Sequence, residues 1–182
     1  MKDGAPSWRA LTAGEAAMAR CLFGEAIDYD RVRIYRRRYL PFGLQPMHCA
    51  MAPNGHIYFH QSRCLPDFSG GSALARHWFM HEMVHVWQHQ LGYPVRLRGA
   101  VRIGLNYDYA LDVALTLADY NMEAQGELLA DYFALHHLGA PAVMRHRAYA
   151  NAGALYEQVL AGFLTDPANR ENLPKGILAR LR

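Results

Sequence analysis

Residues 72–94, SALARHWFMHEMVHVWQHQLGYP, decide the fold of this chain. Ser72 is a residue type that caps helix N-termini, and Gly92 and Pro94 stop helices, so the stretch predicts a helix from about Ser72 to Leu91. Apolar residues fall on several faces of that helix, which is typical of a buried central helix. A buried polar side chain without a partner is costly, so the polar residues of this helix must have partners.

Two of these polar residues, His81 and His85, form an HExxH motif with Glu82. Residues four positions apart lie on one face of a helix, about 6 Å apart, so both imidazoles can reach one metal ion. Glu82 projects to the side of the pair, where it can accept a proton from a metal-bound water. Helical drift keeps His77 and His89 away from the same ion, and we expect them behind the ligands or at the surface. The alternative is a helix with two hydrogen-bonded core histidines and no metal.

A catalytic zinc ion takes three protein ligands and leaves its fourth position to water, so a third ligand should come from a second helix. Residues 121–138 predict that helix, and Glu123, Glu127 and Asp131 form a stripe of carboxylates on one of its faces. The spacing leaves two assignments open. Either Glu127 binds the metal and Asp131 holds a ligand histidine by its other nitrogen, or Glu123 binds the metal with another acid behind it. A solvated stripe without a ligand is the simplest alternative.

The residues before the HExxH helix predict a short helix followed by a small sheet. Thr12 and Glu15 suit a capping box for a helix over 12–27. Segments 31–40 and 55–62 are rich in β-branched and aromatic residues and predict strands. The turn signal at 53–55 allows a hairpin between 47–52 and 56–61.

The residues after the two metal-site helices predict further helix. A long helix is expected over 141–164 and a short final helix over 176–181, whereas 109–118 can be helical or extended. The fold class is therefore α+β and mainly α: a small sheet or hairpin precedes the buried HExxH helix, and two long helices follow it. The length of the chain predicts a single domain over 1–182, with its core at about 31–164.

Composition and charge argue against two classes of partner. The net charge is only +3, and no stretch approaches about 18 apolar residues, so we expect neither nucleic-acid binding nor a membrane span. The arginine cluster over 31–38 alternates with apolar residues and predicts a solvated edge strand. The N-terminus shows no ordinary secretory signal, which indicates a cytoplasmic protein or one exported by a dedicated apparatus.

The motif HEMVHVWQHQ at 81–90 and the segment YNMEAQGELLADYF at 120–133 together resemble a family. The chain resembles the small bacterial zincin-like, vgr-related HExxH metallopeptidases, whose genes often lie near type VI secretion genes. The resemblance covers roughly residues 50–138. In that group the acid of the second segment falls on Glu123, which favours Glu123 as the third ligand and leaves Glu127 second. The chain departs from the usual pattern at Ala124 and Gly126.

The resemblance implies a zincin-like fold and a zinc-dependent peptidase. His81, His85 and Glu123 would hold Zn²⁺, and Glu82 would act as the general base in cleavage of a peptide or cell-wall peptide bond. An extended substrate would then bind along the edge of strand 56–61. The alternative is a non-catalytic metal-binding or accessory protein of a secretion apparatus, which would not need Glu82.

Two further kinds of side chain are candidates for the site. Gln88 lies one turn after His85 and can orient a ligand or fill a polar niche. A tyrosine can donate a hydrogen bond to an oxyanion, and the candidates are Tyr107, Tyr109, Tyr120 and Tyr132.

Overall fold

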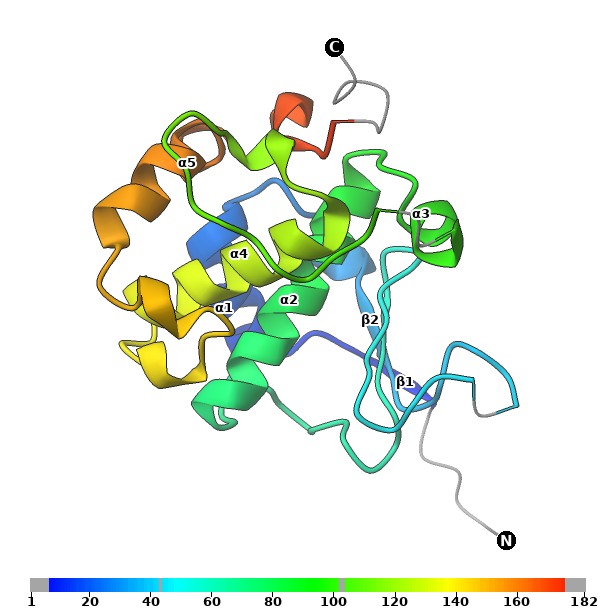
Figure 1. Cartoon of the computed structure of the whole chain (residues 1–182). Helices are drawn as coiled ribbons and strands as arrows, with labels where there is room; N and C mark the ends of the chain where they lie inside the picture. Colours follow the sequence, from blue (N-terminus) through cyan, green and yellow to red (C-terminus); the bar gives the residue numbers. More distant parts are fainter. Residues whose placement is uncertain (1–6, 43, 102–103, 176–182) are drawn as a thin grey trace, which may run out of the picture.

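The structure is a computed structural model that describes residues 7–42, 44–101 and 104–175. It is mainly helical with one small sheet, which confirms the predicted α+β class (Figure 1). The final helix expected over 176–181 lies outside the described residues.

The HExxH helix is α2, which spans Ala73–Gln90. The Ser72 side chain caps it by accepting the N–H of Ala75 at 3.2 Å. Gly92 follows with a φ of 91°, a left-handed conformation that ends a helix at little cost only for glycine. Every residue from 79 to 88 is buried, so the predicted central helix is confirmed in its bounds, cap and burial.

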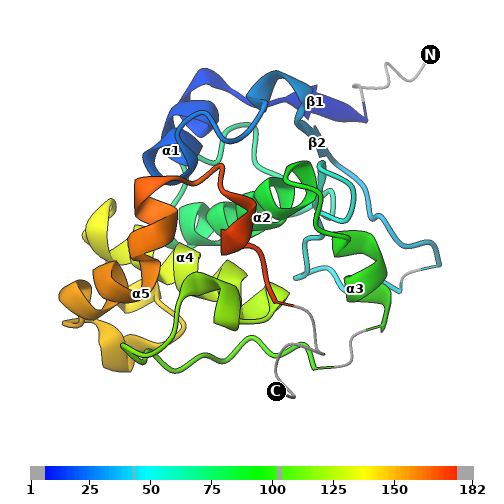
Figure 2. The same cartoon turned by 90° about the horizontal axis from the view of Figure 1, so that it is seen from above.

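Aromatic packing explains why α2 is buried. Trp87 lies between Phe23 of α1 (Ala13–Phe23) and Phe163 of α5 (Gly153–Thr165), with ring centroids at 6.1 and 5.3 Å. All three side chains are fully buried, and each contributes roughly 1.5–3 kcal/mol by leaving water. Figure 2 shows α1 and α5 on the same side of α2.

Helix α4 spans Met122–His136 and forms the most extensive helix contact of the described chain with α2. The Asn121 side chain caps it by accepting the N–H groups of Glu123 and Ala124. At Gly126 the backbone of α4 comes close to α2, because a Cβ there would lie 2.6 Å from His81 Cε1. The α4 backbone therefore lies directly against the HExxH face.

The sheet has three short strands in the order β1 (Trp8–Ala10), β2 (Arg33–Tyr35) and β3 (Ile57–Tyr58). β1 is antiparallel to β2, and β2 is parallel to β3. The strands predicted over 31–40 and 55–62 are present but shorter than expected, and the third strand, β1, lies outside the segments predicted as strands. The expected edge strand is wrong, because β2 is central. The Arg33 guanidinium of β2 lies 4.9 Å over the ring of Trp8 in the neighbouring strand β1.

The predicted hairpin is reduced to one antiparallel bridge between Met51 and Tyr58. The Tyr58 N–H donates to the Met51 carbonyl at 2.9 Å, and the Met51 N–H donates back at 3.2 Å. These bonds use the outer edge of β3 at Tyr58. An extended substrate therefore cannot pair with the outer edge of β3 at Tyr58. The expectation that a substrate binds along the edge of strand 56–61 is wrong at this residue, because the segment 49–52 lies on that edge.

The region after α4 differs from the single long helix expected over 141–164. Only α5 is α-helical there, and two 3-10 turns, η3 (Pro141–Val143) and η4 (Arg147–Tyr149), precede it. The break has a physical cause: the backbone N–H groups of Arg145 and His146 donate to the Asp131 carboxylate and not to a helix.

Two smaller predictions are also settled. α1 has the predicted capping box of Thr12 and Glu15 but ends at Phe23, since Gly24 with a φ of 49° terminates it before residue 27. Segment 109–118 is largely irregular, with η2 (Leu117–Asp119) at its end. α3 (Val95–Val101) was not predicted.

Candidate metal centre

Three ligand atoms converge between α2 and α4. His81 Nε2 and His85 Nε2 are 3.1 Å apart, and Glu123 Oε2 lies 3.4 Å from the first and 3.2 Å from the second. Ligands at 2.0–2.1 Å from a tetrahedral zinc ion are separated from one another by about 3.4 Å. The triangle formed by these atoms therefore has the size of one face of such a coordination tetrahedron. The residues fit a small cation that prefers nitrogen and oxygen ligands.

The side chain of Gln88 fixes the orientation of His85. Gln88 Oε1 accepts a hydrogen bond from His85 Nδ1 at 2.8 Å, which leaves Nε2 free to point at the centre. The Gln88 amide donates in turn to the Met122 carbonyl and to Gln125 Oε1, so it cannot rotate freely. Of the two roles considered for Gln88, the structure shows the orienting one.

The two candidate acids lie on different sides of His81. Glu123 faces Nε2, whereas Glu127 Oε1 lies 3.4 Å from Nδ1, behind the ring. A metal held at Nε2 of both histidines is therefore within reach of Glu123, while Glu127 is placed to hold the His81 ring. This geometry favours Glu123 over Glu127 as the third ligand.

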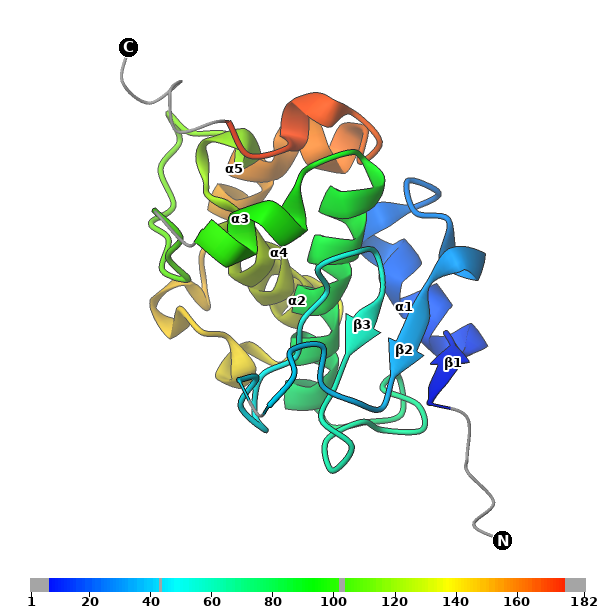
Figure 3. The same cartoon turned by 90° about the vertical axis from the view of Figure 1, so that its right-hand side faces the viewer.

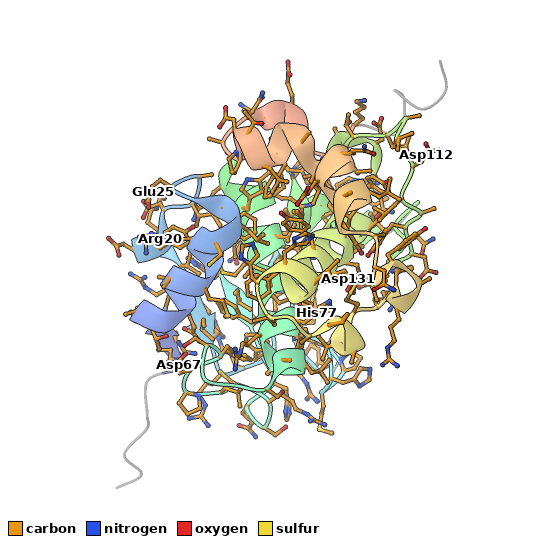
Figure 4. The ribbon with its side chains drawn as sticks, turned by 90° about the vertical axis from the view of Figure 1, so that its left-hand side faces the viewer. Arg20, Glu25, Asp67, His77, Asp112 and Asp131 are labelled. Atoms are coloured by element: carbon orange, nitrogen blue, oxygen red, sulfur yellow. The ribbon has the colours of Figure 1, made fainter. Side chains whose placement is uncertain are left out.

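Asp131 does not hold a ligand histidine, so that part of the Glu127 alternative is wrong. It pairs with His77, whose Nε2 lies 2.7 Å from Oδ1 (Figure 4). His77, Glu127 and Asp131 form a second group of possible ligands, with atoms within 4.8 Å of one another. His77 is buried in this pair, while His89 lies exposed, as expected for a surface group.

The Asp131 carboxylate is already saturated with donors. Besides His77, it accepts hydrogen bonds from the Tyr109 hydroxyl at 2.6 Å and from the backbone N–H groups of Arg145 and His146 at 2.8 and 3.0 Å. A carboxylate offers about four acceptor sites, so little capacity remains for a cation. The second group is therefore better suited to holding the chain together than to binding metal.

Charge is concentrated around His81, His85 and Glu123, the first group of possible ligands. Burial alone would lower the pKa of His81, but the neighbouring carboxylates of Glu123 and Glu127, each 3.4 Å from a ring nitrogen, raise it well above the usual value. Burial works against ionisation of Glu123, yet the charges of His85 and His81 hold its pKa far below the usual value. Without a metal, protons on the histidines thus supply the positive charge that the carboxylate requires.

Glu82 is buried beside this centre, with 4% of its surface exposed. Burial raises the pKa of its carboxyl group, although His81 and His85 act in the opposite direction. Among the described residues, Glu82 Oε2 has no hydrogen-bond partner. A buried carboxylate oxygen in this state needs a water or a bound polar group, which is what a general base beside a metal would contact.

A cleft gives access to the centre. Two hollows of about 680 and 360 Å³ share the residues Ala50, His81, Glu82 and Tyr107. The larger hollow has an apolar wall that includes Phe68 and Trp78.

Of the four candidate tyrosines, Tyr107 is the one that lines the cleft. Its ring stacks 6.0 Å from that of His81. The hydroxyl groups of Tyr109 and Tyr120 donate to Asp131 and the Ala110 carbonyl, and Tyr132 packs on His136.

The sequence interpretation missed the role of Gln125. This residue is fully buried, and its amide donates to the carbonyls of Leu117 at 2.8 Å and Asn172 at 3.0 Å, while its oxygen accepts from Gln88. It links the metal centre to the C-terminal segment. The signal was available, because a glutamine two positions after Glu123 on an apolar helix requires buried partners.

No family model matches the chain. It is 44% identical over 136 residues to the type VI secretion system spike protein VgrG2b of Pseudomonas aeruginosa, a match that covers 71% of this chain but only 13% of that protein. The solved effector domain of Pseudomonas aeruginosa VgrG2b is also similar, with 39% identity and a TM-score of 0.66, over 85% of this chain and 83% of that one.

These relatives support the vgr-related part of the resemblance and its link to type VI secretion. No described helix is long and apolar enough to cross a membrane. The chain belongs to the family of the VgrG2b effector domain.

Proposed function

We propose that this chain is a zinc-dependent peptidase and a type VI secretion effector. The observation that carries the proposal is the triangle of His81 Nε2, His85 Nε2 and Glu123 Oε2, which lies beside the buried, unpartnered carboxylate oxygen of Glu82. The similarity to an effector domain supports the link to secretion.

The residues of the site have three proposed roles: metal ligand, support of a ligand histidine, and general base. His81, His85 and Glu123 would hold the ion, with Gln88 and Glu127 behind the two histidines. When bound, the zinc ion supplies an electrophile that acidifies a water molecule and polarises a carbonyl group. Glu82 takes the proton of the attacking water and returns it to the leaving amine. Burial favours the protonated form of Glu82, which suits the second half of that task.

The proposed substrate is a peptide or a cell-wall peptide. Residues 48–50 line the larger hollow together with its apolar wall, and residues 50–53 line the smaller one. An extended chain could place its scissile carbonyl near the centre while its side chains enter the two hollows. The proposed route to that substrate is export by the secretion apparatus.

The second candidate function is a non-catalytic metal-binding or accessory protein of the secretion apparatus. The relatives favour this candidate more directly, because they connect the chain to a secretion spike and an effector domain without naming a reaction. Both candidates need the same ligands, but a structural site has no use for a buried Glu82 with a free oxygen.

Variants of three glutamates separate the two functions and the two ligand assignments. Glu82→Gln should keep the metal and lose peptide cleavage by about 10²–10⁴-fold, because an amide cannot accept the proton. Glu123→Gln should weaken zinc by more than about 100-fold, whereas Glu127→Gln should cost only about 10–100-fold. Metal content, chelator competition and peptide cleavage provide the measurements, with Glu157→Gln on the exposed face of α5 as control.

The opposite results would overturn specific parts of the proposal. Full activity of Glu82→Gln would remove Glu82 as the general base, whereas a zinc-loaded wild-type chain that cleaves no peptide would favour the accessory function. Loss of zinc from Glu127→Gln but not from Glu123→Gln would reverse the ligand assignment. Retention of full zinc by a protein with both His81→Ala and His85→Ala would remove the site itself.

A further inference from the structure

Positive charge is segregated within this chain. Residues 31–66 and 83–107 contain nine arginines and no aspartate or glutamate, whereas the rest of the chain has ten basic and sixteen acidic residues. The small net charge of +3 therefore conceals a strongly basic part and an acidic part. Among the described residues, no arginine of 31–66 forms an ion pair with a carboxylate.

The basic part carries a loop with apolar residues at its tip. Phe42 is 98% exposed, and Leu44 and Met47 are 68% and 52% exposed. Arg36 and Arg37, both exposed, lie at the base of the loop. A turn closed by the Leu44 N–H and the Pro41 carbonyl holds Phe42 outward.

The backbone of Phe42 is itself unfavourable. Its φ is 54°, a left-handed conformation that is costly for a bulky side chain, and no other described non-glycine residue has a positive φ. An exposed aromatic ring in a strained conformation does nothing for the stability of the isolated chain. Both costs would be offset only by a partner that receives the ring.

Helix α3 extends this surface. Leu97 is 63% and Val101 46% exposed, and the exposed Arg96 lines the smaller hollow of the cleft. Tyr39 and Leu40 from the base of the loop line the same hollow as α3. Figure 3 faces this side of the molecule, and Figures 1 and 2 agree that α3 and the loop project from it.

We propose that this surface, formed by residues 36–42 and 44–47 and by α3, docks on an anionic lipid bilayer. Exposed apolar side chains surrounded by arginines match the two layers of such an interface: the rings and aliphatic groups enter the acyl boundary, and the guanidinium groups meet lipid phosphates. The arginines of 31–66, with no carboxylate among them, match lipid phosphates, and a nucleic acid would leave Phe42 without a role. Docking would hold one end of the metal cleft next to the membrane.

Vesicle binding tests the proposal without any need for catalysis. The full chain should sediment with vesicles of mixed phosphatidylcholine and phosphatidylglycerol but not with phosphatidylcholine alone. Salt should release it, because the Debye length falls from about 8 Å at 0.15 M to about 3 Å at 1 M. Phe42→Trp should show a blue-shifted emission on binding, while Val113→Trp, at a 71% exposed site next to Asp112 in the acidic part, should not.

Matched variants separate the apolar and the charged contributions. Phe42→Ser should weaken binding to the mixed vesicles roughly tenfold. Arg36→Gln with Arg37→Gln should weaken it about 25-fold, since each arginine near an anionic surface is worth about fivefold. Val113→Ser and Arg147→Gln serve as controls and should change nothing.

Three results would overturn the proposal: equal binding to both kinds of vesicle, equal effects of Phe42→Ser and Val113→Ser, or no binding to vesicles together with binding to a DNA duplex. Since none of these measurements involves metal or peptide cleavage, the lipid surface can fail while the proposed peptidase stands, and the reverse.

Discussion

Two acid–histidine pairs on the same two helices have opposite roles. His85 with Glu123 and His77 with Asp131 lie two helical turns apart along α2 and α4, and both pairs are largely buried. The Glu123 carboxylate contacts only the two histidine nitrogens among its described hydrogen-bond and ion-pair partners, while the Asp131 carboxylate also accepts from a tyrosine hydroxyl and two backbone N–H groups.

The difference shows that residue type and spacing do not define a metal site. What decides whether a carboxylate can bind metal is the number of hydrogen-bond donors that already contact it, because a saturated carboxylate has no lone pair to offer a cation. The pair of His85 and Glu123 remains available to bind a metal ion, whereas the pair of His77 and Asp131 holds residues 145–146 against α4.

The largest expected effect concerns stability. Asp131→Asn should lower the free energy of unfolding by about 3–5 kcal/mol, because it breaks a buried pair and turns an amide donor toward other donors. Glu123→Gln in metal-free protein should cost less than half of that, since this side chain holds no backbone group. Urea unfolding of the metal-free proteins measures both values. Equal costs would end the distinction between the two pairs.

A smaller effect is expected from the residue that orients His85. Gln88→Leu should weaken zinc binding by about 10–100-fold, because Nδ1 loses its acceptor and the ring is no longer held toward the centre. His77→Gln is the matched control on the same helix and should change zinc affinity by much less. Chelator competition compares them, and an equal loss in both variants would mean that the two pairs act as one unit.

The pH dependence gives the finest comparison, about tenfold per pH unit. The folded pKa of His81 is raised, so zinc must displace its proton, and zinc affinity should increase with pH up to that pKa. In metal-free protein the same shift stabilises the fold fully below about pH 6.5 and is lost as the pH rises through the folded pKa.

Asp131 should show the opposite sign. Burial opposes its ionisation, but its hydrogen bonds, first that of His77, lower its folded pKa, so its contribution is present above about pH 4 and lost as the pH falls through that pKa. Thermal unfolding of metal-free His81→Ala and Asp131→Asn across pH checks both signs. Zinc affinity independent of pH would contradict the protonated state assigned to His81.

Local signals in the sequence predicted the central elements well. Ser72 and the Thr12–Glu15 pair start their helices where the structure has them, because a cap depends only on residues within one turn. The prediction was poorest for 141–164. In this segment the backbone N–H groups of Arg145 and His146 bind the Asp131 carboxylate. This contact joins residues far apart in the sequence, so no local pattern predicts it.

The sequence by itself determined the two helices, the histidine pair with Glu82 between them, and the stripe of three carboxylates, because these depend on helical periodicity. Only the tertiary structure decided which carboxylate meets which histidine. The antiparallel packing of α2 and α4 sets Glu123 against His85 and Asp131 against His77, and the loops around them saturate one acid and leave the other available. That assignment depends on packing distances and competing donors, which the spacing of residues along a chain does not encode.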